Sequence, residues 1–130
     1  MKEKIKLELP IYFTTSKLKP QLVGMNWYRN VHYHQESMIK KFYHSLIAGL
    51  LPSPRPKLKG EIKVEYVLYY KNKQSDLMNI VSVIDKYLLD GLQAIGVIEN
   101  DNVENYVKTE IRVAEQDKKR PRLMCEIMEI

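Results

Sequence analysis

The chain has 130 residues, 45% of them hydrophobic, which is enough for one domain with a buried core and too few for two. Its 21 lysine and arginine residues exceed its 16 acidic residues, so the formal charge of +5 favours an anionic partner without identifying it. The single cysteine, Cys125, excludes an internal disulfide and a multi-cysteine zinc site, and it fits a reducing compartment.

The first half of the chain is predicted to form a strand, a long loop and a helix. Residues 4–9 alternate apolar and charged side chains, which predicts a strand that Pro10 ends. Residues 14–34 are polar, basic and aromatic, and we interpret them as a long functional loop. Apolar residues recur at helical spacing over 35–51, and the segment PSPRP at 52–56 ends that helix.

The next segment is predicted to form a strand and a second helix. Residues 61–70 alternate at first and become apolar on both sides, so this strand is expected to be central in a sheet. Ser75 and Asp76 are both good N-caps for a helix that runs to about Ile95, and Gly96 is placed to stop it.

The end of the chain is predicted to contain two more strands, over 102–115 and 123–130, joined by a basic turn at 118–122. The order strand, helix, strand, helix, strand, strand predicts one two-layer α+β domain over residues 1–130, with helices packed on a small mixed sheet. No apolar run reaches the roughly 20 residues that span a bilayer. Because residues 1–10 also lack a signal-peptide pattern, we expect a cytoplasmic protein with no membrane partner.

A polar stripe borders the core face of the second helix. At about 100° per residue, the core face comprises Leu77, Ile80, Val81, Ile84, Leu88, Leu92 and Ile95. The stripe beside it comprises Asp76, Asn79, Lys86 and Asp90, together with Val83. Two carboxylates, an amide and an ammonium group beside buried surface suit a metal or phosphate site. The alternative is a solvated face, since Lys86 and Asp90 also form a common i, i+4 pair.

The strings SDLMN at 75–79 and LLDGLQAIGVIENDNV at 88–103 resemble the signature of RusA-type Holliday junction resolvases. That signature consists of an Asp-Leu-Asp-Asn box, a helix that ends in Asp-Ala-Leu, and an Asp-Asp pair. Residues before the box resemble the family only loosely. Matching positions in this chain, with four extra residues placed before the lysine, are Asp76, Asn79, Lys86, Asp90 and Asp101.

The resemblance implies a homodimeric, phage-type endonuclease that uses Mg²⁺ or Mn²⁺ to cut four-way junctions and other branched DNA. It implies that Asp76 and Asp101, with Asp90 as a ligand or as an acid that orients them, bind the metal, and that Lys86 stabilises the scissile phosphate. These residues would serve DNA recombination, repair or replication. The chain has no glycine-rich phosphate loop, so we also expect no nucleotide cofactor.

Two residues depart from the family pattern. Met78 stands where the box has its second aspartate, and Asn100 replaces the first aspartate of the later pair. A thioether does not hold a hard divalent cation, which requires oxygen ligands. The competing interpretation is therefore a protein that binds branched DNA without cutting it. Asp85 lies about 180° around the helix from Asp76 and is not expected to replace the missing carboxylate.

DNA affinity is expected to come from phosphate contacts and to fall with salt. The candidate contacts are Lys17, Lys19, Arg29, Lys71, Lys73, Lys86 and the turn formed by Lys118, Lys119, Arg120 and Arg122. Each basic cluster is equally compatible with a solvated turn. Aromatic candidates for stacking on exposed bases are Trp27, Tyr28 and Tyr33, with a core position favoured for Trp27. His32 and His34 form an H-x-H pair, which is interpreted as ordinary loop or core histidines rather than a zinc site.

Overall fold

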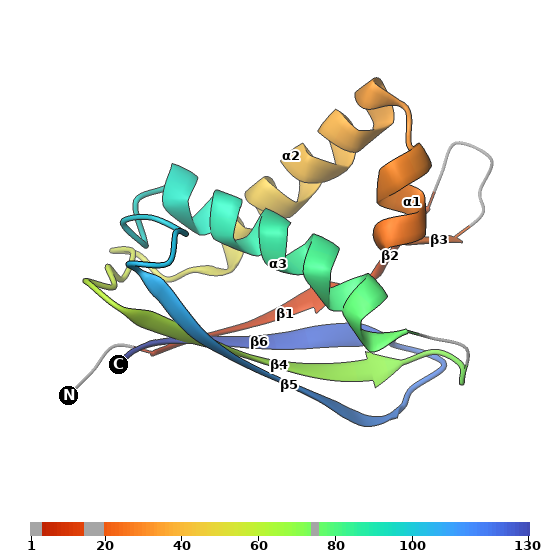
Figure 1. Ribbon diagram of the computed structural model, residues 1–130. Coiled ribbons are helices and arrows are strands. Elements are labelled where there is room, and N and C mark those ends of the chain that lie inside the picture. Colours follow the sequence, from red (N-terminus) through yellow and green to blue (C-terminus); the bar gives the residue numbers. More distant parts are fainter. Residues whose placement is uncertain (1–3, 15–19, 74–75) are drawn as a thin grey trace.

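The computed structural model describes residues 4–14, 20–73 and 76–130, and it has the α+β architecture that the sequence predicts (Figure 1). Its elements in chain order are β1 (Lys4–Pro10), β2 (Tyr12–Thr14), β3 (Pro20–Leu22), α1 (Met25–Asn30), α2 (Tyr33–Leu50), β4 (Ile62–Tyr70), α3 (Leu77–Ala94), β5 (Tyr106–Gln116) and β6 (Arg122–Glu129). Among the described residues, no helix has the length and apolar character needed to cross a membrane.

A four-stranded mixed sheet forms one layer, with the strand order β1-β6-β4-β5. Strand β4 pairs parallel to β5 and antiparallel to β6, and β6 pairs antiparallel to β1. The prediction that β4 is central is confirmed. Helices α2 and α3 cover one face of this sheet, and in the part of the chain that the structure describes no helix covers the other face (Figure 1). The two-layer arrangement is therefore the predicted one.

The core lies between the sheet and the helices. Alternate residues of β4 point into it, and Ile62, Val64, Tyr66 and Leu68 are all buried. The helical spacing of α3 likewise buries its predicted core face, except that Leu77 and Ile95 at the two ends are only partly covered. The predicted helix end at Gly96 is also confirmed, because this residue has a positive φ of 78° just beyond the C-cap.

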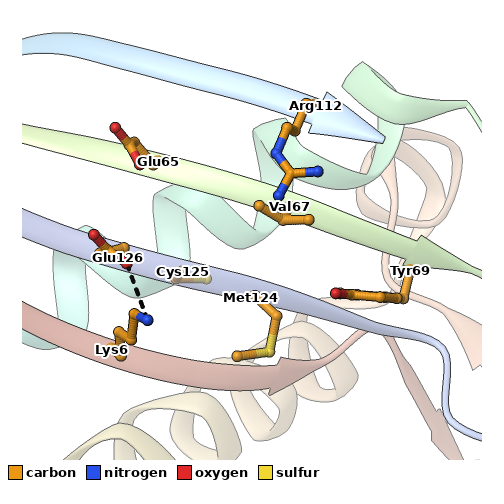
Figure 2. A pocket seen from close by; sticks show the side chains of 8 residues that line it. All are labelled: Lys6, Glu65, Val67, Tyr69, Arg112, Met124, Cys125 and Glu126. Carbon is orange, nitrogen blue, oxygen red and sulfur yellow. Dashed lines mark ion pairs between the residues drawn. The ribbon is translucent and has the colours of Figure 1, made fainter. Parts of the chain in front are cut away.

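The open face of the sheet is lined with charged side chains that pair with one another. Figure 2 shows part of it, a shallow hollow of about 290 Å³ in which Lys6 of β1 lies 3.6 Å from Glu126 of β6. A second lysine, Lys4, lies 2.6 Å from the same carboxylate. Ion pairs this exposed contribute little stability. They do keep this side of the sheet hydrophilic, which explains the alternation of charged and apolar residues along the strands.

The prediction of a long loop over 14–34 is wrong. The described part of this segment contains the small β2–β3 hairpin and α1, and α2 already begins at Tyr33. The anchor is Trp27, which is only 8% exposed and packs edge to face against Phe13 at 5.4 Å between ring centroids. Strands of three residues and a helix of six are too short to produce a recognisable period, so the sequence pattern did not reveal them.

Candidate functional site

Helix α3 begins within the string at 75–79 that resembles the family's Asp-Leu-Asp-Asn box, called the acidic box below, and Asp76 is the N-cap of the helix. Asp76 has an extended backbone conformation, and its Oδ1 accepts a hydrogen bond from the backbone N of Asn79 at 3.3 Å. This satisfies one of the amide groups that the first turn of a helix leaves without a partner. The prediction that Asp76 caps the helix is confirmed, whereas Ser75 lies outside the described residues. The Asp76 side chain remains exposed, so capping leaves it accessible to a ligand.

Asn79 attaches the first turn of α3 to the start of α1. Its Oδ1 accepts a hydrogen bond from the backbone N of Asn26 at 3.3 Å. Gly24, the N-cap of α1, packs so closely against it that an added Cβ would lie 2.6 Å from the Asn79 Nδ2 atom. The sequence leads us to expect that Asn79 holds the first turn of this helix in place, and the structure adds a partner for it: Asn79 attaches α3 to α1, the helix whose Arg29 lines the same cavity as Asp76.

An open cavity of about 760 Å³ lies where α1 meets the beginning of α3. Asp76, Met78 and Asn79 line one side of it, and Asn26 and Arg29 of α1 line the other. Residues from two distant parts of the sequence thus place a carboxylate, two amides and a guanidinium group around one cavity. A guanidinium suits a phosphate group, and carboxylate and amide oxygens suit a hard cation. Met78 is 54% exposed and adds no oxygen ligand.

The rest of the polar stripe lies where α3 contacts α1 and α2. Lys86 has its Nζ atom 5.7 Å from the centre of the Tyr28 ring. Its interaction with the Tyr28 hydroxyl raises the pKa of Lys86, and the negative charges of Asp90 and Glu36 add to this effect. Asp90 in turn lies 4.0 Å from Lys40 of α2. The prediction that these residues share one side of α3 is confirmed by their contacts.

Asp101 does not lie with Asp76 in the same chain. Asp76 precedes the first residue of α3, and Asp101 lies in the turn after its last, so the whole helix of 18 residues separates them. A helix of this length extends about 27 Å. Figure 1 shows that the start of α3 and the turn before β5 are at opposite ends of the molecule. Two carboxylates that share a cation must have oxygens within about 5 Å of each other, because each lies 2.0 to about 2.6 Å from the ion.

The other predicted catalytic residues are also dispersed. Asp90 is 14 residues from Asp76, which corresponds to roughly 21 Å along the helix, and Lys86 is about 15 Å along it. Within 4–14, 20–73 and 76–130, no group of three acidic, histidine or cysteine side chains is arranged to hold a metal ion. A metal ion bound by both Asp76 and Asp101 would therefore need ligands from two chains.

Asp85 is the acid that the sequence analysis set aside, and the structure places it in a polar cluster beneath α3. Its Oδ1 accepts hydrogen bonds from the hydroxyl groups of Tyr66 of β4 and, at 3.0 Å, Tyr106 of β5. Burial raises the pKa of Asp85, and the nearby charge of Asp101 adds to the rise. The angular argument was right that Asp85 points away from Asp76. Its two partners, Tyr66 and Tyr106, lie on two strands that the sequence did predict. Only the pairing of β4 with β5 brings both tyrosines to Asp85, and the sequence did not indicate that pairing.

Comparison with known proteins does not assign the chain to a family. No protein-family model matches it, and no curated protein matches its sequence. The likeness to RusA-type resolvases therefore rests on the residue string alone and stays a prediction.

The predicted DNA contacts are scattered over several surfaces. Arg29 lines the cavity with Asp76, while Lys71 lies 5.1 Å from the centre of the Tyr12 ring and Lys73 is exposed. In the basic turn, Arg122 bonds Asp117 at 2.8 Å. Lys17 and Lys19 lie outside the described residues.

The aromatic and histidine candidates have local roles. The rings of His32 and His34 stack at 5.2 Å, and His32 Nδ1 accepts a hydrogen bond from the backbone N of His34 as the N-cap of α2. The pair therefore has a local structural role at the start of α2. Trp27 is a core residue, as the sequence favoured, whereas Tyr33 is 74% exposed and accessible for stacking.

Proposed function

We propose that the chain is a metal-dependent endonuclease that cuts branched DNA as a homodimer. The observation that carries the proposal is the cavity at the start of α3, where the exposed carboxylate of Asp76 and the guanidinium of Arg29 line the same space. It coincides with the residue string that resembles the metal-binding box of RusA-type resolvases. Neither the acid nor the arginine is needed in that position for the packing of the core.

The residues present fit a hard divalent cation in part. Asp76 and the neighbouring amide oxygens are suitable ligands, and Met78 is not. When bound, Mg²⁺ or Mn²⁺ would activate the attacking water and neutralise charge at the phosphorus. Because Asp101 lies at the far end of α3 in the same chain, the second acidic ligand is assigned to Asp101 of the partner subunit.

The roles of the other residues follow from where they lie. Arg29 binds the phosphate beside Asp76, and Asn79 keeps α1 in the position that brings Arg29 there. Lys86 and Asp90 lie farther along α3, so Lys86 contacts a neighbouring phosphate rather than the one that Asp76 serves. This departs from the role that the resemblance implied for Lys86. It keeps the predicted DNA contact.

Cleavage of a synthetic four-way junction with Mg²⁺ or Mn²⁺ tests the proposal. Asp76→Asn keeps an N-cap of equal quality, so the fold should lose almost no stability while cutting falls at least a hundredfold. Asp76→Ala loses the cap as well and should destabilise the chain by about 1 kcal/mol. Asp101→Asn should abolish cutting and leave junction binding intact. Glu99→Gln removes an exposed acid from the same turn as a control and should cut normally.

Mixing two inactive variants decides whether the site is shared between chains. In a dimer of one Asp76→Asn chain and one Asp101→Asn chain, a shared arrangement leaves one of the two sites intact. Random assortment should then restore about a quarter of the wild-type sites. A site confined to one chain would give no restoration. If the wild-type protein binds the junction and leaves it uncut with either metal, the enzyme proposal is wrong and the binding-protein interpretation takes its place.

A further inference from the structure

Strand β5 is an edge strand that is exposed along its whole length. It pairs with β4 on one side and forms the margin of the sheet on the other (Figure 1). None of its 11 residues is buried, and Val107 and Val113 are 39% and 46% exposed. A long exposed edge of this kind offers unpaired backbone groups to another strand. Proteins usually prevent such pairing with short, covered, charged or bulged edges. Strand β5 is long and uncovered, and its register against β4 shifts only near its two ends, so residues 108–113 form a regular edge whose charges decide what can pair with it.

The side chains of β5 alternate between two different surfaces. Thr109, Ile111 and Val113 pair with core-facing residues of β4, so they lie on the helix side of the sheet. Lys108, Glu110 and Arg112 lie on the open face. Figure 2 shows Arg112 on that face, reaching over Val67 of β4. One side of the edge is therefore apolar or β-branched, and the other alternates in charge.

This pattern is complementary to itself in one register. If two copies of β5 pair antiparallel with Ile111 opposite Ile111, each Glu110 faces an Arg112 and each Thr109 faces a Val113. A shift that centres the pair on Glu110 sets glutamate against glutamate and Lys108 against Arg112. A shift to Arg112 sets arginine against arginine. Opposite charges directly across a strand pair are favourable and like charges are not, so the register at Ile111 is the preferred one.

We propose that the chain forms a homodimer by antiparallel pairing of β5 with β5 of a second copy, with Ile111 on the two-fold axis. The two sheets then join into one, with both helical layers on the same face. Arg112 supplies the specificity, because no ion pair in the described part of the chain engages it, while Glu110 already lies 3.2 Å from Lys63. We assign a second copy of the chain as the partner of this edge, because the order of charges along β5 is complementary to the same order read in the opposite direction.

The polarity of this pairing bears on the proposed nuclease site. Because β5 runs parallel to β4, its end lies near the start of α3, and its beginning follows the turn that contains Asp101. Antiparallel pairing sets the beginning of each β5 beside the end of the other. It therefore brings the turn of each subunit to the end of the sheet where α3 of the other begins. This consequence rests on the proposed function, whereas the dimer does not.

Cross-linking at the two-fold axis tests the register. Ile111→Cys places two cysteines directly opposite, with Cα atoms about 4.5 to 5.5 Å apart, within the range of a disulfide. Mild oxidation should convert most of this variant to a covalent dimer. Thr109→Cys is the matched control, because its copies lie four residues apart along the strands, about 13 Å, and should not cross-link. Cys125 is buried and remains unchanged in both variants.

A charge exchange tests the same pairing without cysteine. Glu110→Arg and Arg112→Glu should each raise the dimer dissociation constant about tenfold by setting like charges opposite one another. The double variant restores opposite charges and should recover the wild-type constant, measured by sedimentation. A monomer at all concentrations, or a dimer that Ile111→Cys does not cross-link, would overturn the proposal. A cross-linked dimer that fails to cut junctions would contradict only the proposed nuclease function. An active enzyme that does not form this cross-link would contradict only the proposed β5–β5 interface.

Discussion

The polar cluster beneath α3 gives a quantitative test of the packing between helix and sheet. Tyr66 is 1% exposed, and its hydroxyl donates to the half-buried carboxylate of Asp85. Tyr66→Phe removes this donor with little change in side-chain shape. A hydrogen bond to a charged group contributes about 1.5 to 3 kcal/mol, so urea unfolding at pH 7 should show a loss of that size. In this variant Tyr106 still donates a hydrogen bond to the same oxygen, so the Asp85 carboxylate keeps one donor.

A double-mutant cycle separates the charged hydrogen bond from the loss of the phenol itself. In an Asp85→Asn background the acceptor is neutral, so Tyr66→Phe should cost only about 0.5 to 1.5 kcal/mol. The difference between the two backgrounds is the coupling, expected to be about 1 kcal/mol. A cost for Tyr66→Phe below about 0.5 kcal/mol, or an equal cost in both backgrounds, would refute the assigned hydrogen bond.

The same cluster predicts a sign for the pH dependence of stability. Burial raises the pKa of Asp85 above its value in the unfolded chain, so the folded state favours the neutral acid. Its contribution to the free energy of unfolding is therefore full below the unfolded pKa and is lost as pH rises through the folded pKa. The stability of the wild type relative to Asp85→Asn should fall as pH rises from about 4 towards neutrality. A difference that stays constant or grows with pH would contradict this account.

Three backbone and packing predictions can be checked by the same unfolding measurement. Gly24→Ala places a Cβ 2.6 Å from Asn79 Nδ2 and should cost about 1 to 3 kcal/mol, and Asn79→Ala in the same chain should recover part of that loss. Gly96→Ala should cost about 1 kcal/mol, because its φ of 78° is unfavourable for alanine. Tyr43→Phe removes a hydrogen bond of 2.6 Å to the Pro10 carbonyl and should cost about 1 kcal/mol. No loss at any one of these positions would contradict the contact assigned there.

The long elements were predictable because each contains enough residues to display a period. The alternation over 61–70 and the helical spacing over 77–94 both extend through the core, although α3 also buries Val83, Tyr87 and Leu89, which lie outside its predicted core face. The segment 14–34 was not predictable by that means. Its order comes from Trp27 and from a hydrogen bond between the backbone N of Val23 and the carbonyl of Ile11 at 2.8 Å, which are tertiary contacts without a sequence period.

Only the part of the candidate site that α3 contributes was predictable from the sequence. Helical spacing correctly placed Asn79, Lys86 and Asp90 along one side of α3, where they meet α1 and α2. It could not bring Arg29 to Asp76, because that depends on how α1 docks, and α1 itself was not expected. Spacing along a helix determines the direction in which a side chain points. It does not determine which other segment lies opposite.

The position of Asp101 shows how the length of one helix constrains the whole functional proposal. A shorter helix would return the turn at 96–105 close to the acidic box, and one chain could then supply both acids. Because α3 has 18 residues, the turn instead reaches the opposite end of the sheet, where β5 begins. The acids can then meet only if a second chain runs in the reverse direction beside the first. An exposed β5 whose charges match in that direction supplies such a partner, so the same geometry that separates the acids within one chain favours their meeting between two.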